Sequence, residues 1–280
     1  MTDYAATAPD WQEWQGRWDA MQAAYLPFRE ERFTIMLDAV EALVGTKFVA
    51  VDLASGPGAI SRRLLTRFPQ ARSVAVDYDP ALLALGRGVL GTQDGRLRWV
   101  EADLRDPAWI DQLGEERVDA VLSTTALHWL DTGSLARVYR QLGSLVRPGG
   151  VVLNGDHMKF PPHLPSFRAL AGWIAERQRA EAFDARGADD WRGWWSAFAQ
   201  QPGMGPLVEE RERRFARGSG QRHGTGAADA GDAEEVVGAV DEEETSPIGE
   251  VHEAALRDAG FREVGLIWRQ PDDGVLLAVR

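Results

Sequence analysis

The chain has no cysteine and no apolar run of about 18 residues, the length that crossing a membrane requires. The lack of cysteine excludes disulfides, thiolate nucleophiles and cysteine-bound metals, and it fits a reducing compartment. The N-terminus also lacks a signal-peptide pattern. We therefore expect a cytoplasmic protein that holds no metal and does not contact a membrane.

Positive charge is scarce. Lys and Arg number 31 against 43 Asp and Glu, so the formal net charge is −12 at pH 7. Because binding to nucleic acid requires a basic surface, this balance argues against a nucleic-acid partner. The one basic cluster, Arg211 to Arg214, is interpreted as a solvated face of a helix. At 280 residues the chain can form one large domain, or a domain with a cap, around a sizeable core.

The stretch from Lys47 to Ser61, KFVAVDLASGPGAIS, predicts a strand, a glycine turn and the start of a helix. Its apolar run from Phe48 to Val51 is rich in strand formers and favours a strand that is covered on both faces. The glycines let the backbone turn tightly and approach a ligand closely. A ligand here would lie at the carboxyl end of a strand, beside the free N–H groups of a helix.

Two kinds of cofactor use such a turn. A dinucleotide requires the pattern G-x-G-x-x-G, whose third glycine lets the helix pack against the strand. Ser61 stands at that third position, so the dinucleotide fingerprint is incomplete. S-adenosylmethionine carries no phosphate and requires only a close approach of the backbone.

The string VDLASGPG, residues 51–58, resembles the first motif of the class I S-adenosylmethionine-dependent methyltransferases. That motif is a hydrophobic residue, Asp or Glu, any residue, and then G-x-G-x-G. Ala54 stands at the first glycine, and the departure is slight because alanine is small. For this string alone, an ordinary turn between a strand and a helix is the alternative.

A second strand, Ser73 to Val76, ends at Asp77, roughly 25 residues after the first motif, where an acidic residue binds ribose hydroxyls in such folds. A carboxylate can accept hydrogen bonds from both hydroxyls. The alternative is that Asp77 and Asp79, followed by Pro80, cap the next helix. Asp79 suits the cap better, which leaves Asp77 free for the ribose.

Later landmarks follow in the order of the same family. The strand at residues 97–100 runs into EADL, and the strand at residues 118–122 runs into STTALHWL, which is similar to the ALHW strings of small-molecule methyltransferases. VRPGG, residues 146–150, resembles the family's L-K-P-G-G turn, and AGFREV precedes the sixth strand as in these enzymes. The resemblance is closest to the group of trans-aconitate, malonyl-carrier and natural-product O-methyltransferases.

The resemblance implies an α/β fold, with a Rossmann-like, doubly wound, seven-stranded and mostly parallel sheet, one antiparallel strand and a helical cap. We expect five segments: an N-terminal helical cap (1–45), the cofactor-binding core (46–159), a helical lid (160–216), an acidic mobile loop (217–249), and a last helix with a strand hairpin (250–280). The loop is expected because its acidic block, Asp241 to Glu244, has no apolar period.

The resemblance also implies which residues hold S-adenosylmethionine. It puts the adenine amino group near Asp103 and the adenine ring against Leu104. Together with the glycine turn and the ribose carboxylate, the expected cofactor-binding set is Asp52, Ala54, Ser55, Gly56, Gly58, Asp77, Tyr78, Asp103, Leu104 and Thr124.

The N-terminal segment carries candidates for contact with the ligands. Tyr25 could reach the methionine part of the cofactor, and Arg29 or Arg32 could hold a substrate carboxylate by a two-pronged bond. Tryptophans also recur there at helical spacing, and for them packing against the sheet edge is the alternative.

Between the fifth strand and the last two, the sequence predicts two inserted helices. The second spans 190–198, and the first runs from Ser166 to Ala185, with inward-facing positions at Phe167, Leu170, Ile174 and Phe183. Trp194 in the second helix is a candidate for contact with a flat or apolar acceptor. A helical pair that only packs on the core is the alternative.

Methyl transfer from a sulfonium is an in-line displacement, and a hydroxyl acceptor requires a base to take its proton. His128 is the first candidate, because it follows the fourth strand, where the crevice opens. His157 is the second. An orienting or packing histidine beside Trp129 is the alternative for His128, and a carboxylate acceptor would need no base.

Three functions stay open. We favour S-adenosylmethionine-dependent methyl transfer to a small-molecule oxygen, either a hydroxyl or a carboxylate. An NAD(P)-dependent oxidoreductase would require the complete glycine fingerprint. A non-catalytic S-adenosylmethionine-binding protein of the same fold would bind the cofactor without turnover. A homodimer is also left open.

Overall fold

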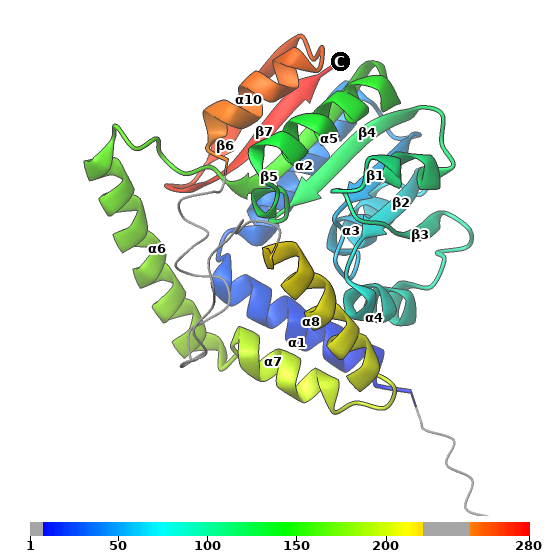
Figure 1. The fold of residues 1–280 in the computed structure, drawn as a ribbon, viewed down its shortest axis with the longest axis vertical. Helices are drawn as coiled ribbons and strands as arrows, with labels where there is room; N and C mark the ends of the chain where they lie inside the picture. The colour runs from blue at the N-terminus through cyan, green and yellow to red at the C-terminus, as the bar shows by residue number, and fades with distance from the viewer. Residues whose placement is uncertain (1–7, 221–246) are drawn as a thin grey trace, which may run out of the picture.

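The computed structural model describes residues 8–220 and 247–280, and a seven-stranded sheet forms its centre (Figure 1). The strands stand in the order β3-β2-β1-β4-β5-β7-β6. They are β1 (Val49–Leu53), β2 (Arg72–Asp77), β3 (Leu97–Glu101), β4 (Val118–Thr124), β5 (Val146–His157), β6 (Glu263–Arg269) and β7 (Asp273–Val279).

The neighbouring strands among β1 to β5 pair in parallel, whereas β7 pairs antiparallel with both β5 and β6. In this sheet β7 is therefore the strand that runs against the others. The strand order reverses direction between β1 and β4, which makes a topological switch point at their carboxyl ends. The predicted doubly wound, mostly parallel sheet with one antiparallel strand is confirmed.

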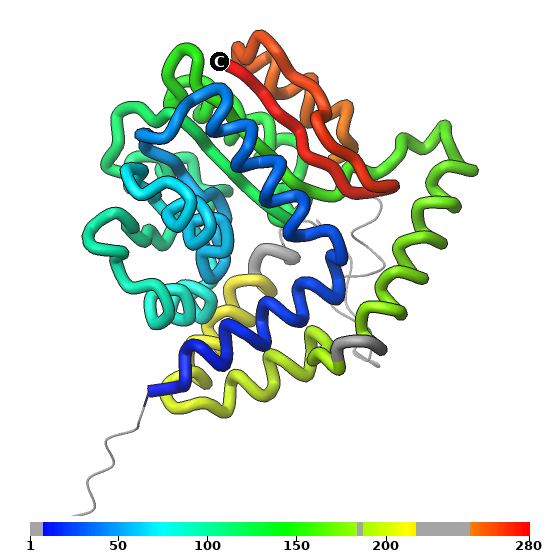
Figure 2. Tube along the Cα trace, turned by 180° about the vertical axis from the view of Figure 1, so that it is seen from behind, coloured from blue at the N-terminus to red at the C-terminus, as the bar shows by residue number. Residues whose placement is uncertain are grey.

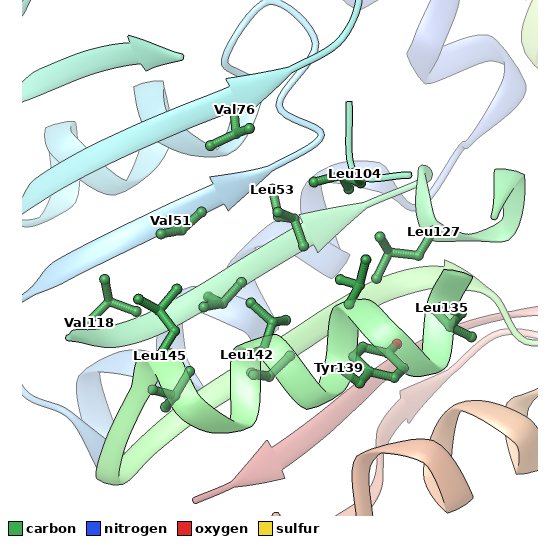
Figure 3. Packing of buried hydrophobic residues seen from close by; sticks show 14 of the residues in the cluster. Val51, Leu53, Val76, Leu104, Val118, Leu127, Leu135, Tyr139, Leu142 and Leu145 are labelled. Carbon is green, nitrogen blue, oxygen red and sulfur yellow. The ribbon is translucent and has the colours of Figure 1, made fainter. Parts of the chain in front are cut away.

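Helices bury both faces of the sheet. On one face lie α5 (Thr132–Leu145), α10 (Gly249–Asp258) and the 3-10 helix η1 (Pro107–Leu113), and on the other lie α2 (Arg29–Leu43) and α3 (Ala59–Arg67). Figure 3 shows Leu135, Tyr139 and Leu142 of α5 among the apolar side chains of the first face. This two-sided burial explains the continuous apolar runs of the central strands.

Aspartates begin several helices. Their carboxylates accept hydrogen bonds from backbone N–H groups at the first turns of α1 (Trp11–Tyr25), α4 (Pro80–Leu90), η1, α5 and α7 (Trp191–Ala199), and the residues are Asp10, Asp79, Asp106, Asp131 and Asp190. Such a cap satisfies N–H groups that have no partner within the helix. The predicted cap at Asp79, with Pro80 after it, is confirmed.

A layer of helices lies beyond the carboxyl ends of the strands, where Figures 1 and 2 show α1, α7 and α8 (Gly205–Gly220) side by side. These helices and α4 share an aromatic core of buried side chains, which include Trp14, Trp18, Trp194, Trp195 and Phe198. The helical segment predicted at the N-terminus and the helices predicted after β5 are thus present.

The helix α6 (Pro165–Arg186) differs from its predicted packing. Phe167 and Leu170 are 52% and 56% exposed, so their predicted inward position is wrong. The reason is that α6 stands beside the sheet (Figure 1) and contacts α1 through its later turns, where the Phe183 ring lies 4.9 Å from that of Tyr25.

The strand β5 begins earlier than predicted. VRPGG was expected to be a turn before the strand, but Val146 already pairs with Val118 of β4. The pairing register then shifts, and Gly149 has a φ of 77°, a left-handed conformation that suits glycine. The turn chemistry is therefore present as an irregularity within the strand.

Residues 1–7 and most of the predicted acidic loop at 217–249, namely residues 221–246, lie outside the described part of the chain. Within the described ranges, no helix has the length and apolar character that crossing a membrane requires.

Candidate functional site

Five parallel strands, β1 to β5, end at one edge of the sheet, and the predicted cofactor-binding and catalytic residues lie on these ends and on the turns after them. The glycine turn follows β1, Asp77 ends β2, Thr124 ends β4 and His157 ends β5. Because the carboxyl edge of a parallel sheet at a switch point is where ligands bind in such folds, the fold brings the predicted residues to a coherent site.

The glycine turn has three left-handed residues, Ala54, Gly56 and Gly58, with φ values of 55°, 53° and 81°. A Cβ added at Gly58 would lie 2.7 Å from the Trp99 ring, so this glycine makes room for packing. A Cβ at Gly56 would meet only Leu82, at 3.7 Å. Gly56 is therefore the position where the backbone can approach a ligand.

Asp52 is used to hold the helix after the turn. Its Oδ2 accepts hydrogen bonds from Ser61 N at 2.8 Å and from Ser61 Oγ at 2.7 Å, and the same hydroxyl lies 2.9 Å from Ser73 Oγ. Burial raises the pKa of Asp52 to about 7, although the bonds from Ser61 oppose this. Ser61, where a dinucleotide site would have glycine, thus has a structural role of its own.

The sequence predicted that Asp77 is free to bind ribose, but in the structure its carboxylate already has protein partners. Its Oδ2 accepts from Gly56 N at 2.6 Å, and its Oδ1 accepts from Asp79 N at 2.7 Å. Burial and the nearby charge of Asp79 raise the pKa of Asp77 to about 6. The carboxylate therefore ties the end of β2 to the glycine turn. Since a carboxylate has about four acceptor positions, capacity for a ribose hydroxyl remains.

The residues expected around adenine lie close together at the next strand ends. Asp103 is held by Arg105, whose Nε and Nη2 reach its two oxygens at 2.9 Å each. The guanidinium of Arg105 lies 5.0 Å from the Tyr78 ring centre. Leu104 is buried at the carboxyl edge of the apolar core with Leu53 (Figure 3). Asp103 is thus paired within the protein, and contact with adenine stays a prediction.

Thr124 and Thr125 follow β4, and their hydroxyls lie 3.3 Å apart. Thr125 has a φ of 54°, which is an outlier for a β-branched residue. Arg32, which is fully buried, donates from Nη2 to Thr125 Oγ1 at 2.5 Å and from Nη1 to Asp273 Oδ1 at 2.8 Å. Arg32 therefore holds the turn after β4, whereas the sequence predicted that it binds a substrate carboxylate.

His128 lies against a buried carboxylate that the sequence analysis missed. Asp156 Oδ1 lies 2.7 Å from His128 Nδ1, and Asp156 Oδ2 accepts from His128 N at 3.1 Å. Burial opposes the charge of Asp156, but His128 holds the pKa of this carboxyl well below its usual range. The ionised carboxylate makes Nδ1 the donor in this pair, so in the neutral ring the basic lone pair is on Nε2.

His157, the second candidate base, lies next to this pair. Its ring centre is 5.1 Å from that of His128, and its backbone N–H donates to Asp156 Oδ1 at 2.9 Å. Burial lowers the pKa of His157 to about 4, so this imidazole is neutral at pH 7. His128, with its carboxylate partner, is therefore the better placed of the two for proton transfer.

The remaining substrate candidates are occupied by other contacts. Arg29 is buried and pairs with Asp19 at 2.9 Å. The Tyr25 hydroxyl accepts from Trp191 N at 3.2 Å. Trp194 is fully buried in the aromatic core shared by the cap helices, so the structure gives it a packing position instead of the predicted acceptor contact.

Two functional features escaped the sequence analysis. Asp156 lies near the carboxyl end of the buried strand β5, as Asp52 does in β1, and an acidic residue soon after an apolar run is the signal that could have found it. Arg211 and Arg214 are not on a solvated helix face, because they pair with Asp79 and Glu101 beside the β2 and β3 ends. Nothing in the local sequence specifies those partners. Among the described residues, no group of three or more His, Cys, Asp or Glu side chains could hold a metal ion.

Residues 50–150 match a family described as a methyltransferase domain. The chain is 33% identical over 136 residues to trans-aconitate 2-methyltransferase of Azoarcus sp. strain BH72, covering 48% of this chain and 49% of that protein. It is 34% identical over 180 residues to the Acidovorax ebreus protein of the same name, covering 61% and 62%. The chain thus spans only about half to three fifths of the length of these relatives.

A solved structure of an O-methyltransferase family protein from Burkholderia thailandensis has a TM-score of 0.52 and 20% identity to this chain, and the match covers 88% of this chain and 55% of that one. At this identity the likeness concerns the fold alone. The matched residues 50–150 contain the glycine turn, the β2 and β3 carboxylates and His128, which are the parts that the resemblance named. Residues 50–150 are therefore similar to a methyltransferase domain, as the resemblance of their motifs implied.

Proposed function

We propose that the chain is an S-adenosylmethionine-dependent methyltransferase that acts on an oxygen of a small molecule. The observation that supports this most directly is the bond from Gly56 N to Asp77 Oδ2 at 2.6 Å. This bond connects two parts of the site. One is the glycine turn, where the backbone can approach a ligand closely, and the other is the carboxylate that suits ribose hydroxyls. His128 follows the neighbouring strand β4 at the same edge.

The residues present fit the cofactor. Gly56 has a left-handed backbone and space for a ligand beside its Cα, and Asp77 keeps acceptor capacity beyond its backbone bonds. The apolar side chains of Leu53 and Leu104 lie at the same edge, where an adenine ring requires an apolar wall. When bound, S-adenosylmethionine supplies an electrophilic methyl group. Ser61 at the third glycine position speaks against a dinucleotide.

The chain's own residues can handle the proton of a hydroxyl acceptor. Asp156 fixes the His128 ring through Nδ1, so Nε2 would take the proton of the acceptor hydroxyl. The bound cofactor would supply the methyl group, whose bond to sulfur would break as the bond to the acceptor oxygen formed, and the thioether would leave as S-adenosylhomocysteine. The carboxylate stabilises the imidazolium that forms, as in other pairs of histidine and carboxylate. The helical layer of α1, α7 and α8 lies beyond this edge (Figures 1 and 2), where it would shield a bound acceptor from water.

The acceptor class follows from the same pair. A base of this kind is needed for a hydroxyl and not for a carboxylate, so His128 and Asp156 favour a hydroxyl acceptor. A carboxylate acceptor is the second candidate, supported by the names of the trans-aconitate 2-methyltransferase relatives. The buried arginines predicted to bind it, Arg29 and Arg32, pair with Asp19 and Asp273.

Calorimetric titration of the purified chain with S-adenosylhomocysteine, with NADH as the control ligand, tests the cofactor. Micromolar binding of the first and no binding of the second is the expected result. Binding of NADH alone would overturn the proposal in favour of an oxidoreductase. Transfer of isotope-labelled methyl groups to a panel of phenols, alcohols and carboxylic acids, trans-aconitate included, then separates the acceptor classes. Cofactor binding with no turnover on the whole panel would favour a non-catalytic binding protein.

A cytoplasmic location and a homodimer belong to the same proposal. The lack of cysteine fits a reducing compartment. The edge strand β6 exposes Leu266 and Ile267, which fits pairing with a second copy. Cell fractionation tests the cytoplasmic location. Light scattering after gel filtration tests the homodimer, and a monomer at all protein concentrations would contradict it.

A further inference from the structure

The helix α8 lies over the ends of β2 and β3, on the side of the sheet edge where Asp77 stands. Figure 1 shows α8 beside α4, and two of its arginines, Arg211 and Arg214, reach the segment Asp77 to Asp79. They are one helical turn apart and therefore share a face of α8. Their side chains are only 16% and 20% exposed.

Arg211 acts on Asp77 through Asp79. Its Nε donates to Asp79 Oδ2 at 2.8 Å, while the other oxygen of Asp79 caps α4. The backbone N–H of Asp79 donates in turn to Asp77 Oδ1 at 2.7 Å. The guanidinium also lies 4.0 Å from the Trp195 ring centre, which anchors it to the aromatic core.

Arg214 bridges the two strand ends. Its Nη1 donates to Tyr78 O at 2.8 Å, and its Nη2 donates to Glu101 Oε1 at 2.7 Å. The same guanidinium lies 5.2 Å from the Tyr78 ring centre, on which Arg105 also packs. Both the backbone and the ring of Tyr78, the residue next to the ribose carboxylate, are therefore held from α8.

We propose that Arg211 and Arg214 are positioning residues of the cofactor site, which fix Asp77 and Tyr78 for binding of the ribose and adenine. This inference rests on the proposed function. It gives α8 a role in cofactor binding, whereas the lid predicted for residues 160–216 was assigned to the acceptor. Because the arginines touch the ribose-binding segment and not the histidine pair, their loss affects cofactor affinity and not the chemical step.

The test compares Arg214→Ala with Arg213→Ala by calorimetry with S-adenosylhomocysteine. Arg213 is on the same helix, is 56% exposed and pairs only with Glu210 in the interactions described, so it is a matched control. We expect Arg214→Ala to raise the Kd for S-adenosylhomocysteine about tenfold, as the loss of charge-assisted hydrogen bonds predicts, and Arg213→Ala to leave it unchanged. Equal Kd values for the two variants and the parent chain would overturn the proposal.

A kinetic split separates positioning from a general loss of structure. Arg214→Ala should raise the KM for S-adenosylmethionine while kcat at saturation and the KM for the acceptor stay unchanged. A variant with a lower thermal midpoint and a lower kcat, but with an unchanged KM for S-adenosylmethionine, would instead mean that α8 only stabilises the fold. This result would overturn the proposal. Arg211→Ala should likewise raise the Kd for S-adenosylhomocysteine. If this variant does not fold because the buried charge of Asp79 loses its partner, Arg211→Lys keeps the charge and is measured in its place. Failure of the parent chain to bind S-adenosylhomocysteine would reject the proposed function itself.

Discussion

Asp156 accepts two hydrogen bonds from one residue, His128: the backbone N–H donates at 3.1 Å and the ring Nδ1 at 2.7 Å. Two bonds from the same residue fix both the position and the rotation of the imidazole. Asp156 is the last residue but one of β5 and His128 follows β4, so the parallel pairing of these strands brings the two residues together.

Replacement of His128 by Ala is expected to lower kcat about 10²-fold or more on a hydroxyl acceptor, because a general base contributes roughly this factor. Asp156→Asn should lower kcat as well, since it removes the charge that stabilises the imidazolium. Steady-state kinetics over pH 5 to 9 provide the measurement. Unchanged rates for His128→Ala would return this histidine to a packing role, and a larger loss for His157→Gln would make His157 the base.

Cofactor affinity should depend on pH through Asp77. Its pKa is raised to about 6 in the free protein, so the carboxylate is mostly protonated at pH 5 and mostly ionised at pH 7. Because ribose hydroxyls donate to the ionised form, the Kd for S-adenosylhomocysteine should fall as pH rises through about 6 and then level off. Asp77→Asn should raise the Kd at pH 7.5 by the equivalent of roughly 1–3 kcal/mol and remove the pH dependence. Calorimetry at several pH values checks both, and a pH-independent parent Kd would contradict the role.

Stability should depend on pH through Asp52. Its folded pKa is raised from 3.8 to about 7 by burial, so the folded state holds a proton that the unfolded state loses between these values. The contribution of Asp52 to stability is therefore highest at low pH and decreases as pH rises from about 4 to about 7. Asp52→Asn, whose amide can still bond Ser61, should raise the free energy of unfolding at pH 8 by roughly 1–3 kcal/mol. Urea unfolding at pH 5 and 8 measures this, and an equal effect at both values would rule it out.

Ala54 stands where the family motif has glycine and has a left-handed φ of 55°. A side chain in this conformation costs about 1–2 kcal/mol, while glycine loses some stability through its unfolded state. We expect Ala54→Gly to stabilise the protein by about 0.5–1 kcal/mol. Ala50, buried on the preceding strand β1 and not in a left-handed conformation, is the control, and Ala50→Gly should destabilise. Denaturant unfolding of both variants decides it; destabilisation by Ala54→Gly would mean that the turn carries no strain there.

Trp194 is expected to be a packing residue. It is fully buried between Trp14, Trp18 and Phe198, with ring centres 5.8, 4.9 and 4.6 Å away. Trp194→Ala should lower the free energy of unfolding by about 3–5 kcal/mol, the usual cost of a large cavity. Trp173→Ala, at a position that is 58% exposed, should cost far less. If Trp194→Ala raised the KM for the acceptor with stability unchanged, the original prediction of a substrate contact would be right.

The sequence by itself determined the sheet and the place of the cofactor half of the site. Apolar runs that end in Asp52 and Asp77, the glycine turn and the aspartate caps are all local signals, because each depends on residues near in the chain and on backbone conformation. These signals sufficed to predict the individual strands and the edge where the candidate residues lie, whereas the seven-stranded sheet with one antiparallel strand followed from the resemblance to the methyltransferases.

Only the tertiary structure decided which partner each charged side chain has. Arg32 meets Asp273 across 241 positions, Arg214 meets Glu101 across 113, and His128 meets Asp156 across 28. An arginine or a histidine looks the same in sequence whether it binds a substrate or a buried carboxylate. The choice depends on which carboxylates the packed strands and helices bring within hydrogen-bond distance, since a buried charge without a partner is too costly to keep.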